Sequence, residues 1–325
     1  MARFKRAFHD DINDLAHLVM IANFHCIAAE SDAGERLDRF IRRNAEGVDL
    51  TGLREAIADG HVLLNSRRAA KGAKLRAGDV VDARDLPEPS DRRIKPDATA
   101  PLEVVREEAL WVACAKPAAM PTHPLRPDET GTLANAMVAH WPEIADFGDP
   151  PLMGGILHRL DTDTSGIVLA ARTPEAYTNL RAQFAAREVV KTYLALVSGK
   201  VEKPGLLRDE LVHATVHPCR MGDASRVRTD ERPMRAETAY RPLSRHGEYT
   251  LLEVTIRTGV THQIRCQLSL AGLPLVGDAL YGGPRVGGLS RHFLHASAIA
   301  FRDPATGRPV EVRIPLSPEL ADFIA

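Results

Sequence analysis

The alternation of hydrophobic and polar residues along the 325-residue chain predicts two structured units. In the first, residues 31–85, two amphipathic helical patterns surround Leu37 and Leu53, and a short strand-like run follows at residues 61–64. Residues 86–100 are rich in proline and charge and poor in apolar residues, which is typical of a semi-extended linker. The chain therefore divides into a small unit and a larger one joined by this linker.

Residues 1–30 form a predicted extension ahead of the first unit. The apolar stretch at residues 18–22 follows basic residues and superficially resembles a secretion signal. Three aspartates stand before this stretch, Asn23 and His25 end it, and no Ala-x-Ala cleavage site follows. We therefore interpret the segment as an N-terminal extension that contributes no recognisable element.

Strand-like runs predominate in the larger unit, residues 101–325. Residues 167–171 are continuously apolar, and residues 293–301 place apolar side chains on both faces, as strands buried on both sides do. A helix is predicted after Thr173, which serves as its N-cap, with Pro174 at the first helical position. This pattern indicates an α+β fold with a mixed, largely antiparallel sheet.

Composition narrows the class of protein. With 44% hydrophobic and 26% charged residues, and no run near the ~18 apolar residues of a membrane helix, we expect a soluble monomer with no membrane partner. The four cysteines are scattered and form no Cys-x-x-Cys pair, which favours a reducing cytoplasm over a disulfide framework. The net charge is −1, so any nucleic-acid surface must be a local basic patch.

The segment best suited to chemistry is HRLDTDTSG, residues 158–166, because it holds Asp161 just before the apolar strand. An isolated Asp-Thr-Ser-Gly is most often only a turn. Asp161, Asp163, Ser165 and Gly166 also match positions one, three, five and six of a calcium-binding loop. Position twelve, however, is Arg172 and not the required glutamate, so we reject calcium binding.

Other cofactor signals are weak. His213, His217 and Cys219 have a loose metal-like spacing without a fourth ligand pattern. The chain contains no Walker A loop, no G-x-G-x-x-G after a strand and no G-x-S-x-G elbow. We therefore expect neither a metal nor a cofactor.

The nonapeptide HRLDTDTSG resembles the central motif of the RluA-type pseudouridine synthases. Further family blocks follow in the family's order: KTYLALV at 191–197, TGVTHQIRCQL at 258–268, GDALYGG at 277–283 and RHFLHA at 291–296. The resemblance covers most of residues 101–325 and implies the pseudouridine synthase fold. It also implies an enzyme that isomerises uridines in structured RNA by base flipping, without a cofactor.

By this resemblance the obligatory catalytic residue is Asp161. It could attack the sugar carbon, abstract a sugar proton or add to the uracil ring, and all three roles stay open. Arg265 corresponds to the cation that keeps this partly buried carboxylate ionised. Tyr193 corresponds to the tyrosine that packs against the target base and is a candidate for proton transfer at C5. The family also carries an arginine where this chain has Val260.

Three further residues are implied to bind substrate. His158 and Arg159 are a basic pair ahead of Asp161. Arg159 resembles the arginine that enters the RNA where the target nucleotide leaves, which offsets part of the unstacking cost of a few kcal/mol. Leu268, on the predicted helix after Thr261, is implied to form a wall of the pocket.

The first unit is similar to an S4 RNA-binding domain in its segments ERLDRFI, IADGHVLLNS and LRAGDVVD. Residues 67–76 contain five basic residues and no acid, and the expected RNA contacts are Arg67, Arg68, Lys71 and Lys74. Two departures from the S4 pattern stand out. Residues 50–53 replace a usual Ser-Arg, and Ser66 replaces a glycine in the following turn. Either the unit binds RNA, or it has lost that role and only packs against the catalytic unit.

In this family an S4-like module usually accompanies action on large-subunit ribosomal RNA, so ribosomal RNA is the expected substrate and tRNA the alternative. A rival of another class is a non-catalytic RNA-binding or ribosome-assembly factor with the same fold. The intact set Asp161, Tyr193 and Arg265 argues against that rival, because a binding protein has no need to retain all three.

Overall fold

The computed structural model describes residues 22–45, 50–70, 72–86, 93–148, 151–215, 219–229 and 231–325. The chain forms two compact units, which divide between residues 92 and 93. Each unit has its own hydrophobic core. Within the described residues, no helix combines the length and the apolar character that crossing a membrane requires.

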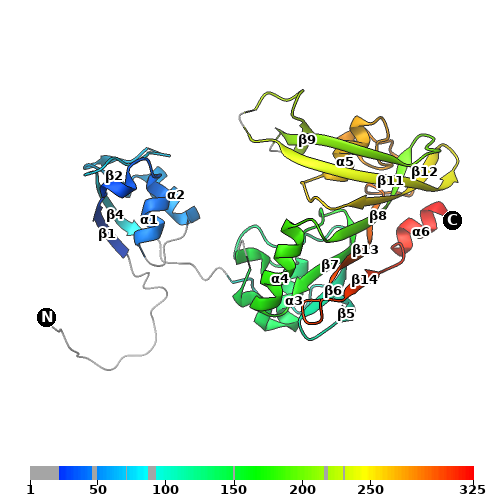
Figure 1. The fold of residues 1–325 in the computed structure, drawn as a ribbon, viewed down its shortest axis with the longest axis horizontal. Coiled ribbons are helices and arrows are strands. Elements are labelled where there is room, and N and C mark those ends of the chain that lie inside the picture. The colour runs from blue at the N-terminus through cyan, green and yellow to red at the C-terminus, as the bar shows by residue number, and fades with distance from the viewer. Residues whose placement is uncertain are drawn as a thin grey trace. The chain divides into compact units, whose positions relative to one another are not determined.

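The N-terminal unit is a four-stranded antiparallel sheet with the order β1-β4-β2-β3 (Figure 1). Its elements are β1 (Ala22–Ile27), the 3-10 helix η1 (Glu30–Asp32), α1 (Leu37–Asn44), α2 (Leu50–Asp59), β2 (Val62–Leu64), β3 (Arg67–Arg68) and β4 (Val80–Leu86). The two amphipathic helical patterns are confirmed: Leu37 and Phe40 from α1 and Leu53 from α2 are buried in one cluster with Val81 of β4.

Strand β1 corrects the predicted boundary of the N-terminal extension. Residues 22–27 were assigned to the extension, but they pair antiparallel with β4. Phe24 and Cys26 pack against the core of this unit, whereas His25 and Ile27 are exposed. The strand is therefore half-buried, and the rest of the predicted extension, residues 1–21, lies outside the described residues.

The predicted linker is also shorter than residues 86–100. The side chain of Ile94 is 2% exposed and belongs to the core of the second unit. The Asp97 carboxylate accepts hydrogen bonds from the Thr99 and Gly131 N–H groups, both at 3.0 Å. One apolar anchor and one carboxylate thus bind the polar segment 93–100 to the larger unit.

The larger unit is built on a ten-stranded sheet. The strand order is β10-β9-β11-β12-β8-β13-β7-β6-β5, and β14 pairs with the later part of β13 (Figure 1). The strands are β5 (Glu103–Glu107), β6 (Trp111–Lys116), β7 (Ser165–Ala171), β8 (Val190–Ser198), β9 (Gly205–Thr215), β10 (Arg220–Asp223), β11 (Met234–His246), β12 (Tyr249–Ile256), β13 (Leu294–Arg302) and β14 (Pro309–Arg313). Only β13 and β7 pair in parallel among these described strands, which confirms the predicted mixed, largely antiparallel sheet.

Few helices accompany this sheet. They are α3 (Leu133–His140), α4 (Pro174–Ala185), α5 (Gln263–Leu270) and α6 (Pro318–Ile324), with the 3-10 turns η2 (Pro142–Asp146), η3 (Pro151–Met153) and η4 (Ala279–Tyr281). The predicted start of α4 is confirmed, because the Thr173 hydroxyl accepts a hydrogen bond from the Ala176 N–H. Helix α5 begins one residue later than predicted. Its N-cap is His262 in a left-handed conformation, φ 52°, so the predicted cap at Thr261 is wrong.

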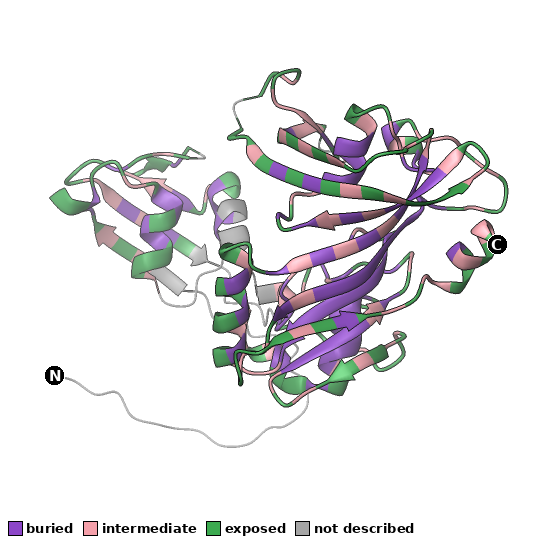
Figure 2. Ribbon diagram, turned by 45° about the vertical axis from the view of Figure 1, so that its right-hand side comes forward, coloured by how far each residue is buried: buried purple, intermediate pink, exposed green. Residues whose placement is uncertain are grey.

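Strand β7 lies in the middle of the core. Its alternate residues enter two different clusters: Val168 and Ala170 pack with α3 and α5, whereas Ile167 and Leu169 pack with α4. Figure 2 shows the buried residues concentrated on these central strands. Helices therefore cover both faces of the sheet, and the strand that follows Asp161 is fixed from both sides.

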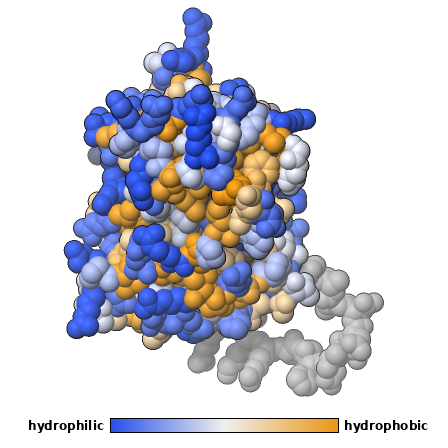
Figure 3. Space-filling model, turned by 90° about the vertical axis from the view of Figure 1, so that its right-hand side faces the viewer, coloured by the Kyte–Doolittle hydropathy of each residue, from blue (hydrophilic) through white to orange (hydrophobic). Residues whose placement is uncertain are grey.

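Apolar side chains also reach the surface at the end of the unit that carries α6. Figure 3 shows them gathered between hydrophilic residues on this face. In this region Leu320 of α6 is fully buried with Phe293, and Phe323 packs against the same cluster while staying partly exposed. The C-terminal helix is thereby part of the core of the larger unit.

Candidate active site

The turn that carries Asp161 is held against β13. A Cβ atom on Gly166 would lie 2.4 Å from the Ala296 carbonyl oxygen, so only glycine allows this approach. The Thr164 hydroxyl hydrogen-bonds His292 at 2.7 Å, and the Ser165 hydroxyl hydrogen-bonds His295 at 2.9 Å. The segment RHFLHA therefore fixes the residues that follow Asp161.

A second set of contacts holds the residues around Asp161 from the other side. The buried Lys116 ammonium donates to the Thr162 carbonyl at 3.0 Å and to the Met120 carbonyl at 2.7 Å. The Thr122 hydroxyl donates to the Leu160 carbonyl at 2.8 Å. Burial lowers the pKa of Lys116 to about 7, against the opposing charge of Asp161. The loop after β6 is thus tied to the catalytic turn.

Arg265 makes the contact with Asp161 that the resemblance implied. Its Nη1 lies 3.1 Å from Asp161 Oδ2, and Nε and Nη2 bind the Asp278 carboxylate at 2.8 and 2.9 Å. Asp278 is 2% exposed and Arg265 8% exposed. Burial opposes the charge of the guanidinium, but Asp278 and then Asp161 outweigh it and raise the pKa of Arg265. This arginine is a fixed cation beside Asp161.

His262 completes the surroundings of the carboxylate. Its Nε2 lies 3.7 Å from Asp161 Oδ2, and its Nδ1 hydrogen-bonds the Tyr281 hydroxyl at 3.0 Å. Burial lowers the pKa of His262, with Asp161 opposing. We therefore expect a neutral imidazole at neutral pH, which leaves Arg265 as the permanent positive charge at this carboxylate.

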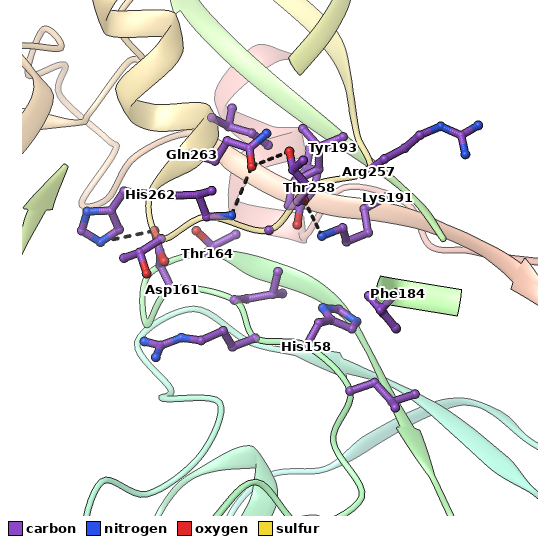
Figure 4. A pocket seen from close by; sticks show the side chains of 18 of the residues that line it. His158, Asp161, Thr164, Phe184, Lys191, Tyr193, Arg257, Thr258, His262 and Gln263 are labelled. Carbon is purple, nitrogen blue, oxygen red and sulfur yellow. Dashed lines mark hydrogen bonds and ion pairs between the residues drawn. The ribbon is translucent and has the colours of Figure 1, made fainter. Parts of the chain in front are cut away.

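A cavity of about 630 Å³ opens above Asp161 (Figure 4). Asp161, Tyr193 and Arg265 all line it, although they come from three separate segments of the chain. The volume is in the range that binds one small organic group with a few polar contacts. The structure thus brings together the three residues that the sequence predicted to be catalytic.

Leu268 does not line this cavity. It is fully buried in the core cluster, and Ile264, one turn earlier on α5, lines the cavity instead. The expectation that Leu268 forms a pocket wall is therefore wrong. Ile264 and Leu268 are four residues apart, so they lie on the same side of α5. Ile264, in the first turn of the helix, reaches the cavity, whereas Leu268, one turn later, packs in the core of the unit.

Tyr193, on β8, is 6% exposed. Burial, and then the charge of Asp161, raise the pKa of Tyr193. A phenol with a raised pKa stays protonated at neutral pH, so it presents a flat apolar face and a hydrogen-bond donor.

His158 and Arg159 both line the cavity, but they are not a basic pair. The His158 Nε2 accepts a hydrogen bond from the Leu169 N–H at 3.1 Å, and burial lowers the pKa of His158 to about 3. A neutral ring results, packed 5.5 Å from the Phe184 ring. Arg159 is exposed, so its permanent positive charge faces solvent.

The predicted RNA contacts of the N-terminal unit are at its surface. Arg67 and Arg68 on β3 and Lys74 are exposed, and Lys71 lies outside the described residues. The turn between β2 and β3 keeps its form despite the missing glycine, because Asn65 and Ser66 have φ of 51° and 63°. Two successive positive φ values are typical of a type I′ hairpin turn.

No group of three or more His, Cys, Asp or Glu side chains with metal-binding geometry occurs among the described residues. His213 binds Glu231 at 2.8 Å, and His217 lies outside the described residues.

Sequence reasoning missed three residues of the site: Asp278, His262 and Lys116. Asp278 and His262 stand in the motifs GDALYGG and TGVTHQIRCQL, and Lys116 is the last residue of β6. No pattern within a single segment predicts that these segments, which are distant in the sequence, lie close to Asp161 in the fold.

Comparisons with known proteins show the family to which the chain is related. A sequence profile of the family described as RNA pseudouridylate synthase matches residues 111–270. An uncharacterized RNA pseudouridine synthase of Chloroflexus aurantiacus is 37% identical, with 90% of each chain covered. Ribosomal large subunit pseudouridine synthase D of Pseudomonas aeruginosa is 34% identical, again with 90% of each chain covered. The solved structure of human RNA pseudouridylate synthase domain containing 1 has the same fold, with a TM-score of 0.53 at 24% identity, covering 68% of this chain and 86% of that one.

Proposed function

Because the chain belongs to the RNA pseudouridylate synthase family, we propose that it converts specific uridines of large-subunit ribosomal RNA into pseudouridine. The observation that carries this proposal is the 3.1 Å contact between Asp161 and the buried Arg265 at the base of a cavity. The choice of ribosomal RNA rests on the names of relatives such as the Pseudomonas aeruginosa protein.

The reaction breaks the bond between uracil N1 and the ribose C1′ carbon and forms a bond from C5 to C1′. The C5 proton is lost and N1 gains a proton, so the isomerisation needs no redox partner. An ionised Asp161 supplies the nucleophile or the general base, whichever of the three routes operates. Arg265 donates a hydrogen bond to this carboxylate at 3.1 Å and places a permanent positive charge beside it.

Tyr193 stands beside this carboxylate as a protonated phenol. We assign to it the packing face for the uracil ring, since aromatic rings bind a flipped base by stacking. A part in C5 proton transfer requires that its own proton move to another group in the same step. Arg159, exposed at the rim, is placed to enter the RNA where the uridine leaves the stack.

The N-terminal unit would add affinity. Its exposed Arg67, Arg68 and Lys74 lie on one polar segment of a small α/β unit, which is the kind of surface that binds phosphates without reading bases. This role, and the likeness to an S4 domain, are part of the proposal.

The test replaces Asp161 by Asn. The variant keeps the size and most hydrogen bonds of the side chain but removes its charge. We expect RNA binding to persist and tritium release from [5-³H]uridine-labelled large-subunit RNA to disappear. Asp163→Asn is the matched control, because the Asp163 side chain is exposed two residues further on in the same turn.

Substantial turnover by the Asp161 variant would overturn the assignment. Labelled tRNA is assayed in parallel with the wild-type protein. Tritium release from tRNA alone would move the substrate from ribosomal RNA to tRNA, and release from neither RNA would favour the non-catalytic binding protein.

A further inference from the structure

The cavity has two ends of different chemistry. At one end, Asp161 lies with His262 and Arg265. At the other, Phe184 lies with Lys191 and Arg257, well away from the carboxylate (Figure 4). We name this second region the Phe184 end, and it comprises Phe184, Arg181, Arg187, Lys191 and Arg257, all of which line the same cavity.

The Phe184 end is strongly positive. Asp161 is the one carboxylate among the described residues that line the cavity, and it is already paired with Arg265. Arg181 donates to the Leu157 carbonyl at 3.3 Å and Arg257 to the Arg187 carbonyl at 3.0 Å. Among the described parts of the chain, neither these arginines nor Arg187 has an acidic partner within ion-pair distance.

This concentration of unpaired charge is not the rule for the unit's arginines. Arg208 on β9 pairs with Glu237 of β11 at 2.8 Å, and Arg241 on β11 pairs with Glu253 of β12 at 2.7 Å. Those cations are neutralised by neighbouring strands. Arg235, which also lines the cavity, pairs with Glu210 at 3.5 Å. The three arginines of the Phe184 end are all exposed and keep their guanidinium charge available to an anion from outside.

The backbone also presents these arginines in a set position. Arg187 has φ of 60°, in the left-handed region that non-glycine residues rarely adopt. Its carbonyl accepts the Arg257 Nη1–H, and its N–H donates to the Phe184 carbonyl at 3.1 Å. The turn after α4 is therefore tied to the end of β12, so Arg187 and Arg257 line the cavity from two segments that contact each other.

Phe184 gives this end an aromatic surface. Its ring is partly exposed, lies 5.5 Å from the neutral His158 ring and has the Lys191 ammonium 5.9 Å from its centroid. Burial lowers the pKa of Lys191 to about 8, so this amine is still mostly protonated at pH 7. Aromatic rings combined with cations are what single-stranded nucleic acid requires, one for a base and the other for a phosphate.

We propose that the Phe184 end is a second nucleotide subsite, which binds the RNA nucleotide next to the target uridine. Its base packs against Phe184, and the phosphate that links it to the uridine is bound by Arg181, Arg187 and Arg257. The inference rests on the proposed function, because it takes the nucleotide at Asp161 to be a uridine of RNA. The continuous cavity joins the two subsites, so an unstacked dinucleotide can occupy both.

The test combines changes in the protein with changes in the RNA. The substrate is an RNA fragment in which the wild-type protein forms pseudouridine. One series replaces the base on the 5′ or the 3′ side of the target with an abasic residue, and a second replaces each flanking phosphate with an uncharged methylphosphonate. The protein variants are Phe184→Leu and the triple variant Arg181→Gln, Arg187→Gln, Arg257→Gln.

We expect the abasic change on one side to raise KM by roughly 5- to 100-fold with the wild-type protein, the range for one lost base–aromatic stack. Phe184→Leu should raise KM for the unmodified RNA by a similar factor. With this variant, the abasic RNA should give nearly the same KM as the unmodified RNA. The triple variant should lower the slope of log K against log salt by about 0.7, the value for one phosphate on a single strand. With the triple variant, the RNA that carries a methylphosphonate on the same side should show no further decrease of this salt slope.

The matched control is Arg245→Gln. Arg245 on β11 is exposed and donates to the Gly247 carbonyl, as the arginines of the Phe184 end donate to carbonyls, but it does not line the cavity. Independent, additive effects of the protein and RNA changes would overturn the proposal, and so would a triple variant that behaves like Arg245→Gln. Wild-type protein on the modified RNAs keeps the test decisive if a variant fails to fold. A wild-type protein inactive on every RNA would instead overturn the proposed function.

Discussion

Removing the charge of Asp278 should reveal how Arg265, the arginine that contacts Asp161, is held. Asp278 is 2% exposed and binds Arg265 through two hydrogen bonds of 2.8 and 2.9 Å. The change Asp278→Asn leaves a buried guanidinium with Asp161 as its remaining carboxylate. Breaking a buried ion pair from one side costs about 3–5 kcal/mol. For a unit of this size each kcal/mol lowers Tm by about 2–4 °C, so we expect a decrease of roughly 6–20 °C.

Activity should fall as well, because Arg265 loses the partner that fixes its orientation toward Asp161. A displacement of about 1 Å at a reacting group costs about 100-fold in rate. The assay is single-turnover tritium release at saturating RNA, at a temperature where the variant is folded. We expect a lower rate with RNA affinity nearly unchanged, since Asp278 is absent from the cavity lining.

Glu237→Gln is the control for this experiment. It removes the carboxylate of the Arg208–Glu237 pair, which is exposed on both sides and should contribute about 0–1 kcal/mol. If Asp278→Asn changed Tm and the single-turnover rate no more than Glu237→Gln does, the reasoning that a buried pair positions Arg265 would be refuted.

Three further predictions follow from the structure. Burial lowers the pKa of His158 to about 3 and of His123, His292 and His295 to about 4, below the ~6.5 of an unfolded histidine. Below pH 6.5 the unfolded chain therefore binds more protons than the folded protein. The free energy of unfolding should be highest above pH 6.5 and should fall toward pH 4 by up to about 1.4 kcal/mol per pH unit for each histidine. A free energy of unfolding in urea that does not change over this pH range would contradict the prediction. Gly166→Ala should destabilise the protein by roughly 1–3 kcal/mol more than Gly272→Ala, because a Cβ meets the Ala296 backbone only at Gly166; equal losses in thermal unfolding would rule out the close approach. Replacing Arg67, Arg68, Lys71 and Lys74 by Ala should lower the salt slope of RNA binding by up to about 3 while turnover at saturating RNA persists; unchanged slope and affinity would mean that the N-terminal unit has no RNA-binding role.

The parts of the fold that could be predicted from sequence are those with strong local signals. The apolar run 167–171 became β7, and the two-faced run at 293–301 became β13, because central strands that are covered on both faces bury mostly apolar side chains. Helix α4 began where Thr173 and Pro174 indicated. Each of these signals lies within one segment, so no long-range contact had to be known.

The predicted boundaries between segments were wrong where one buried residue fixes a segment whose overall composition is polar. Residues 86–100 looked like a linker, yet the single apolar Ile94 enters the core and draws residues 93–100 into the larger unit. Strand β1 was missed because it is short and half-exposed, with Ile27 60% exposed, so its apolar residues do not alternate cleanly. Average composition cannot detect a segment that is fixed by one or two contacts.

His158 shows a different limit. Its sequence neighbour Arg159 suggested a pair of cations, but the charge of a histidine depends on its surroundings. The N–H of Leu169 donates to the ring, which is packed beside Phe184, and burial lowers the pKa of His158 to about 3. The same motif therefore contributes one permanent cation and one neutral ring.

The contact between Asp161 and Arg265 was expected only because a known family shares both motifs; the residues alone are a turn aspartate and a helix arginine, 104 positions apart. Asp278 had no such guide. Its value to the site arises only when α5 and the turn before η4 fold together and exclude water from the pair. An ion pair gains most of its strength from that exclusion, because charges interact far more strongly in a low dielectric than in water. Burial is a property of the assembled unit, so Asp278, the buried partner of Arg265, could be recognised only in the structure.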